Sequence, residues 1–159
     1  YESRVTIAAT IANFHFPLVM SKNLYPKGAI FGYRTNSLIA KVTNKGAVDI
    51  GMRIVFKAKG AVENPKLINV NTGEEFKINK IMASEEEIEI NTNVGEKSVR
   101  GKTNNVDFTN YFMYKDIDST WLQLKLGENL FRYDADDGLD NLEVFVYFHN
   151  KFLEVQECY

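Results

Sequence analysis

The chain has 159 residues, the length of one domain, and should bury roughly two thirds of its unfolded surface on folding. Hydrophobic residues make up 45% of it and charged residues 25%, which argues against a disordered or fibrous chain. The net charge of −2 excludes the basic field that a nucleic acid partner requires. No apolar run reaches the ~18 residues that span a bilayer, and no signal peptide opens the chain. We therefore expect cytosolic synthesis, no nucleic acid partner and no membrane insertion.

The beginning of the chain differs from the rest. Residues 3–16 are rich in Val, Ile, Ala, Thr and Phe and predict a strand, which Pro17 interrupts before a loop. The start at Tyr1 without Met suggests a piece of a longer protein. We predict a lead-in strand and loop over 1–36, linked to a missing N-terminal domain, and a β-sandwich domain over 37–159.

Alternation of apolar and polar residues predicts most of the remaining elements. In residues 86–92, for example, the pattern directs Ile88 and Ile90 toward a core. Glu87 and Glu89 should then lie in water. The predicted strands are, in chain order, 37–43, 52–59, 66–70, 75–81, 86–92, 121–126, 130–133 and 142–148.

Turn-forming sequences separate these strands at intervals of about ten residues. Residues 71–73 (NTG) and 127–129 (GEN) each predict a tight turn that closes a hairpin. Only residues 111–117 predict a helical turn. Closely spaced strands without interleaved helices favour an all-β fold, and we predict a jelly-roll-like antiparallel β-sandwich with at most one short helix.

The sequence offers no catalytic constellation. The two histidines, His15 and His149, are isolated, and no Gly-x-Ser-x-Gly elbow accompanies them. A single cysteine, Cys158, excludes both an intrachain disulfide and a typical zinc site. Glycine-rich phosphate loops are absent as well. We therefore predict no catalytic residue, no cofactor and no enzyme activity.

An acidic cluster near the end of the chain is the best metal candidate. Asp134, Asp136, Asp137 and Asp140 surround Gly138, and hard cations prefer oxygen ligands. The spacing does not fit the register of an EF-hand loop. Because Asp-Gly is a favoured turn dipeptide, we expect a solvated turn, with a calcium site as the weaker alternative.

Aromatic residues are the candidate binding groups. Tyr111, Tyr114, Trp121, Phe145 and Tyr147 could contact a protein partner or stack on sugar rings. The alternative is that these rings belong to the core and only stabilise the fold.

Several sequence pieces occur in an order that resembles the C-terminal domain of siphophage distal tail proteins. Each piece is a turn or strand end, and together they extend roughly from Asn13 to Val155. They include residues 43–48 (TNKGAV), 64–75 (NPKLINVNTGEE), 88–92 (IEINT), 124–129 (LKLGEN) and 144–153 (VFVYFHNKFL). The chain departs from the pattern at 45–47, where the family often has Gly-Asp, and at Asn91, where Asp is usual.

The resemblance implies a galectin-like sandwich and a structural role at the virion tail tip, in a phage or prophage. It implies other tail and baseplate proteins as partners, and a hexameric ring formed by a separate N-terminal domain of the full-length protein. The alternative function is a carbohydrate-binding module that recognises a host cell-wall glycan. An enzyme acting on glycans is a distant third.

Overall fold

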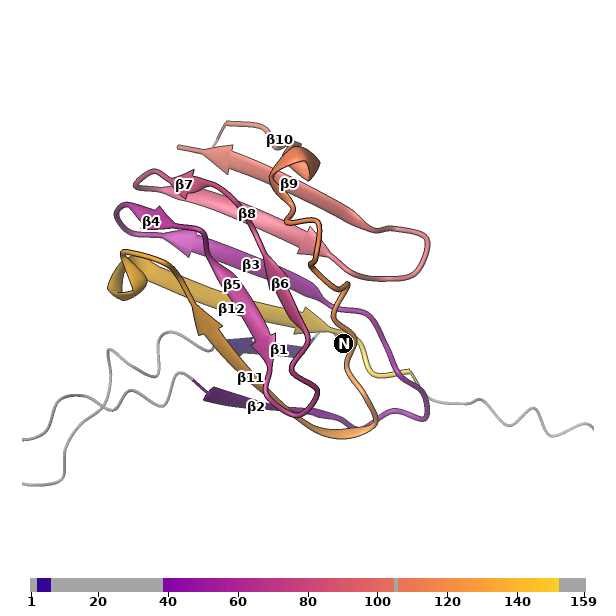
Figure 1. The fold of residues 1–159 in the computed structure, drawn as a ribbon. Coiled ribbons are helices and arrows are strands. Elements are labelled where there is room, and N and C mark those ends of the chain that lie inside the picture. Colours follow the sequence, from indigo (N-terminus) through magenta and orange to yellow (C-terminus); the bar gives the residue numbers. More distant parts are fainter. Residues whose placement is uncertain (1–2, 7–38, 105, 152–159) are drawn as a thin grey trace, which may run out of the picture.

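The computed structural model describes residues 3–6, 39–104 and 106–151 (Figure 1). Predictions that concern Pro17, His15 and Cys158 lie outside these residues. The predicted domain boundary at residue 36 lies outside them too. Within the described part, short strands form two main sheets and a small two-stranded ribbon.

Every strand pair is antiparallel. The six-stranded sheet contains, in spatial order, β1 (Ser3–Thr6), β12 (Leu142–Phe148), β3 (Arg53–Ala58), β8 (Glu86–Asn91), β9 (Ser98–Thr103) and β10 (Thr109–Asn110). The four-stranded sheet contains β2 (Ile39–Asn44), β11 (Gly127–Asp134), β5 (Lys66–Asn69) and β6 (Glu75–Lys77). The ribbon pairs β4 (Val62–Glu63) with β7 (Ile81–Met82).

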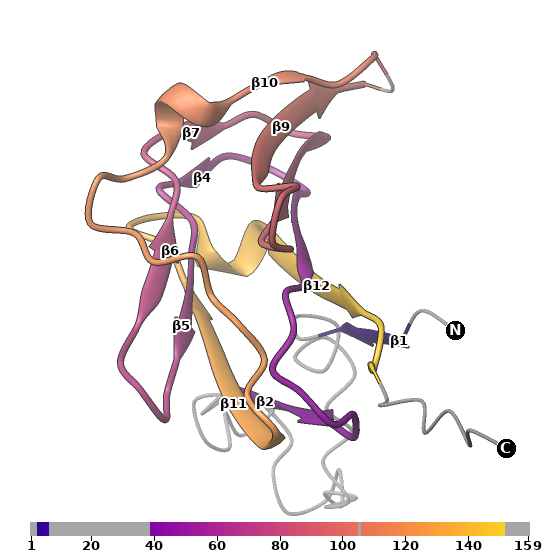
Figure 2. The same cartoon turned by 90° about the vertical axis from the view of Figure 1, so that its right-hand side faces the viewer.

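The two sheets pack face to face as a sandwich. In Figure 2 the layer with β5, β6 and β11 lies opposite the layer that contains β12. Helical structure in the described residues is limited to two 3-10 turns, η1 (Phe112–Tyr114) and η2 (Leu139–Asn141). The predicted all-β antiparallel sandwich is confirmed, and η1 lies inside the segment where a helical turn was expected.

The core lies between the sheets and follows the predicted alternation. On β3, β8 and β12 every second side chain points inward, and aromatic rings from the other sheet meet them. The buried residues of these three strands include Ile54, Phe56, Ile88, Ile90, Val144 and Val146, and β11 of the other sheet contributes Phe131 and Tyr133. Such period-two burial is what stabilises a sheet with one face on a core.

One predicted hairpin is wrong. Residues 121–126 do not pair with 130–133, because β11 begins already at Gly127 and pairs with β2 and β5. Leu122 and Leu124 are buried as the alternation suggested, but the segment is an extended connection with one isolated bridge, from Leu124 to Ile50, in the described residues. Burial on one side produced the strand-like pattern without a neighbouring strand.

The other predicted hairpin is confirmed: β5 and β6 pair across residues 71–73, with Gly73 at a φ of +77°. The sequence patterns do not predict β9, whose alternation is hidden by Gly101. A side chain at that position would overlap the Tyr111 ring, which covers the glycine from the inner side. The glycine therefore provides room for the aromatic ring, a need that is visible only in three dimensions.

Candidate interaction surface

Residues 111–120 cross from the edge of one sheet to the edge of the other, with η1 at their start. The amide of Asn79 donates to the carbonyl oxygen of Tyr114 at 2.7 Å, and that of Asp116 donates to Lys77 at 3.0 Å. The amide of Thr120 donates to Glu75 at 2.9 Å. Figure 1 shows η1 as the coil beside β9. These backbone bonds fix the connection against β6 and the residues that follow it.

A series of aromatic rings leads from the core to this surface. Phe76 is fully buried, and its ring centroid lies 5.1 Å from that of the half-buried Trp121. The ring centroid of Phe112 lies 6.2 Å from that of Trp121, and the two ring planes are inclined by 31°. Trp121 is therefore the middle ring of the three, and Phe112 is the most exposed.

Three large apolar side chains of this connection are exposed. The exposed fraction is 52% for Phe112, 77% for Met113 and 91% for Ile117. We call these three residues the η1 patch. Single exposed apolar residues need no explanation, but a group on one anchored turn is typical of an interaction site.

A buried charge pair supports the turn from below. Glu86 is 1% exposed, and its Oε1 lies 2.8 Å from Nζ of Lys80. Its Oε2 accepts hydrogen bonds from Lys80 Nζ at 3.1 Å and from the Ala83 amide at 2.7 Å. Oε1 has no hydrogen bond of good geometry, so the Lys80 charge is what compensates it. A buried carboxylate without such a cation would be strongly destabilising.

The same lysine contacts the predicted tyrosines. Lys80 Nζ lies 5.5 Å from the ring centroid of Tyr111 and 5.6 Å from that of Tyr114, and the two rings meet edge to face at 5.2 Å. Burial, and then the negative charge of Glu86, raise the pKa of the Tyr111 hydroxyl. The tyrosines thus belong to the support of η1.

A groove of about 290 Å³ lies beside Phe112. Lys97, just before β9, and Arg100 on β9 line it together with Phe108, just before β10. The Arg100 guanidinium lies 5.0 Å from the Phe108 ring centroid, and Lys97 Nζ lies 5.8 Å from that of Trp121. Cations and aromatic rings therefore form the walls together.

On the outer face of the six-stranded sheet, the predicted exposure of Glu89 is wrong. Glu89 points outward, as the alternation predicts, but it is 6% exposed instead of lying in water. Its carboxylate pairs with Arg53 at 3.3 Å and, more closely, with Arg100. Flanking arginines from the neighbouring strands cover it, and single-strand periodicity does not reveal cross-strand neighbours.

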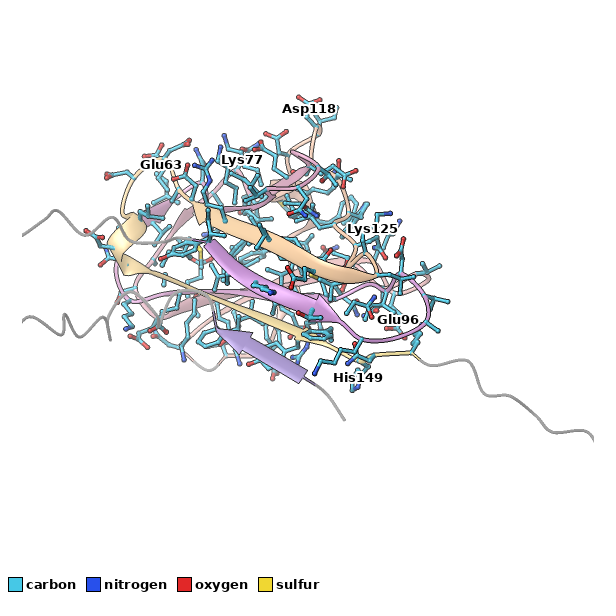
Figure 3. The ribbon with its side chains drawn as sticks, turned by 90° about the horizontal axis from the view of Figure 1, so that it is seen from below. Glu63, Lys77, Glu96, Asp118, Lys125 and His149 are labelled. Carbon is cyan, nitrogen blue, oxygen red and sulfur yellow. The ribbon has the colours of Figure 1, made fainter. Side chains whose placement is uncertain are left out.

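A second pocket, of about 370 Å³, lies where β3, β8 and β12 start or end. Tyr147, His149 and Lys151 line it together with Arg53, whose guanidinium lies 4.2 Å above the Tyr147 ring. Figure 3 shows His149 and Glu96, another lining residue, at the same end of the molecule. Phe145 is half-buried on the outer face of the same sheet.

The acidic cluster forms local contacts of a turn. Asp137 Oδ1 accepts a hydrogen bond from the Gly138 amide, and Asp134 Oδ1 accepts one from Ala135, both at 2.8 Å. A hydrogen bond from Asn64 at 2.8 Å is the main cause that lowers the pKa of Asp136. No group of three or more candidate metal ligands converges among the described residues.

The predicted aromatic candidates thus separate into two groups. Tyr111, Tyr114 and Trp121 belong to η1 and the connection around it and pack against the core, whereas Phe145 and Tyr147 belong to the outer face of the six-stranded sheet. The candidate list lacks Met113 and Ile117, the most exposed members of the η1 patch. Their signal in the sequence is a set of bulky apolar residues inside a predicted turn, where polar residues are usual.

The described strands form an antiparallel β-sandwich, a class of fold that hosts both binding proteins and purely architectural ones. Residues 45–152 match the family described as "Siphovirus-type tail component, C-terminal domain". Because the match covers more than half of the chain, the chain belongs to this family, and the predicted family relationship is confirmed. The family is one of phage tail components, and residues 45–152 correspond to its C-terminal domain.

Other comparisons add less. No curated protein sequence matches the chain. One similar solved structure, a chain of the "Structure of the Phage P2 Baseplate in its Activated Conformation with Ca", is 13% identical with a TM-score of 0.44. The match covers 67% of this chain and 35% of the baseplate chain. Neither helical turn in the described residues is long enough to cross a membrane.

Proposed function

We propose that this chain is the peripheral sandwich domain of a distal tail protein, located at the tail tip, and that it binds a neighbouring tail protein through the η1 patch. The observation that carries this proposal is the exposure of Phe112, Met113 and Ile117 on a connection, residues 111–120, that is hydrogen-bonded to β9 of one sheet and β6 of the other. Aromatic residues and Met are enriched at protein interfaces, and a rigid turn loses little conformational entropy on binding.

In the full-length protein, two domains would have separate roles: one forms a ring, and the sandwich domain contacts the neighbouring tail protein. In this proposal an N-terminal domain before the sandwich forms a hexameric ring, so each ring presents six copies of the η1 patch around its rim. Residues 1–36 would then link the two parts. The family membership and the resemblance of the sequence support this arrangement.

The test is tail assembly with Ile117→Asp, introduced into the full-length tail protein. A charge in the centre of an apolar contact should prevent docking, so purified tails should lack one neighbouring protein. Size-exclusion chromatography with light scattering should still find the ring, because the substitution lies outside the ring-forming domain.

The matched control is Val70→Asp, because Val70 is an exposed apolar residue on the β5–β6 turn, away from η1. This variant should assemble normally. Complete, infectious tails from Ile117→Asp would contradict the proposal.

A second candidate function is binding of a host-wall glycan. The pocket beside Tyr147 favours it, because an aromatic ring, amides and charged groups line one cavity. Tyr147→Ala should then reduce retention of the protein on purified host cell walls, whereas Ile117→Asp should not. Equal retention of Tyr147→Ala and the unchanged protein would exclude this pocket as a glycan site.

A further inference from the structure

We infer that the groove lined by residues 97–100, 108–110 and Phe112 receives a carboxylate-bearing, extended segment of the neighbouring tail protein. This inference rests on the proposed function, because the groove and the η1 patch share Phe112. It adds the chemistry of the partner, which the exposed apolar patch alone does not specify.

The charged side chains that line the groove are all positive. Its lining contains two cations, Lys97 and Arg100, and two phenyl rings, Phe108 and Phe112, but no carboxylate. Because Arg100 pairs with Glu89, the uncompensated positive charge of this lining is that of Lys97. Charge complementarity at an interface selects partners and their register more than it adds affinity.

The two cations have different roles. Arg100 is already paired with the buried Glu89 and lies against the Phe108 ring, so it forms a fixed wall of the groove. Lys97 is exposed and makes no ion pair with any residue that the structure describes, and its ammonium group lies 5.8 Å from the Trp121 centroid. Lys97 is therefore the group that would meet a partner carboxylate.

The backbone beside the groove favours an extended partner. β10 contains only Thr109 and Asn110, both exposed, and it pairs with β9 as the last strand of the described sheet. A strand at the edge of a sheet offers backbone groups to an incoming chain. An alternating segment could then direct apolar side chains toward Phe112 and a carboxylate toward Lys97.

Two synthetic peptides of equal length test the inference, one alternating Asp and Leu and the other alternating Asn and Leu. The two differ in charge but hardly in shape. Titrated into the isotope-labelled chain, the Asp peptide should shift the amide resonances of Lys97, Arg100 and Phe112. It should bind about two- to fivefold more tightly than the Asn peptide, as expected for one exposed ion pair.

Lys97→Gln should remove this preference and leave the binding of the Asn peptide unchanged. Lys45→Gln, at an exposed lysine of the β2–β3 connection, is the matched control and should keep the preference. Added salt should weaken only the Asp peptide.

Equal affinity for both peptides, no binding of either, or shifts confined to other surfaces would overturn the inference. The proposed function fails separately. If the chain binds the Asp and Asn peptides equally while Ile117→Asp still blocks tail assembly, the docking role of the η1 patch is retained. Only the inferred carboxylate of the partner is then rejected.

Discussion

The two 3-10 turns of the sandwich have the same length but present different chemistry. Around η1, bulky apolar side chains face solvent, and the support consists of aromatic rings and the Lys80–Glu86 pair. At η2, Leu139 packs against the core, and the exposed positions carry acidic groups such as Asp140. A single helical turn can therefore either close a connection or display residues, depending on what anchors it.

The anchor of η2 is backbone geometry. Gly138 has a φ of +73°, and a side chain there would overlap the carbonyl oxygen of Ala61. Asn141 accepts a hydrogen bond from the Lys59 amide at 2.8 Å and donates to Ala61 at 3.2 Å. η2 is thus held by close main-chain packing and the Asn141 side chain, whereas η1 has aromatic rings and the Lys80–Glu86 pair beneath it in addition to its backbone bonds.

Gly138→Ala should have the largest effect and tests the η2 half of this comparison. The left-handed conformation and the overlap with Ala61 together should lower the free energy of unfolding by about 2–4 kcal/mol. Gly73→Ala is the control, since Gly73 has a similar φ of +77° with no atom within 4 Å of the added carbon. It should cost about 1 kcal/mol, and urea denaturation compares the two. Equal losses would show that the Ala61 contact is unimportant.

Lys80→Met tests the side-chain anchor of η1. Removing the cation leaves Glu86 buried without compensation, so the free energy of unfolding should fall by about 3 kcal/mol. Amide hydrogen exchange should accelerate at η1 more than at η2. Lys41→Met, which breaks an exposed pair with Glu128, should cost less than about 1 kcal/mol. Uniform acceleration across the sandwich would refute a local anchor.

The pH dependence of stability tests one tyrosine near each turn, Tyr133 near η2 and Tyr111 near η1. Burial, and then the charge of Asp140, raise the pKa of Tyr133 to about 12, against about 10 in an unfolded chain. Between these values the unfolded chain loses the proton that the native protein keeps, so stability should fall as pH rises from about 10 to about 12.

Tyr133→Phe should make the decline in stability shallower in chemical denaturation at several pH values. A smaller decline should remain, because the pKa of Tyr111 near η1 is raised as well. An unchanged slope in Tyr133→Phe would contradict this account.

Calcium should have the smallest effect. The acidic groups before η2 already accept hydrogen bonds from Gly138, Ala135 and Asn64, so we expect the melting temperature to stay constant when calcium is added. A ligand that binds only the native state would raise it. A concentration-dependent rise, lost in Asp136→Asn, would establish the alternative calcium site.

The sequence predicted those parts of the fold that depend on local periodicity. The strand 142–148 and the hairpin across 71–73 follow from alternation and turn residues, which are properties of consecutive positions. The false hairpin at 121–133 shows the limit of this reasoning. Leu122 and Leu124 alternate because one side of the segment is buried, and burial does not require a partner strand.

The candidate site was predicted only in part, for a related reason. Tyr111, Tyr114 and Trp121 were among the five aromatic candidates, but the sequence could neither separate them from Phe145 and Tyr147 nor tell a supporting ring from an exposed one. That distinction depends on Phe76 and Lys80, which are distant in the chain and contact these rings only in the folded protein. Exposure of Ile117 likewise depends on what packs around it.

The sequence by itself determined the class of fold, the inward face of most strands and membership in a tail protein family, because repeated local patterns encode them. Tertiary structure alone decided that Glu89 is covered by arginines, that Gly101 makes room for a ring and that Phe112 is more exposed than Trp121. Each of these outcomes results from contacts between residues on different strands or connections, and such contacts form only when the two sheets close on each other.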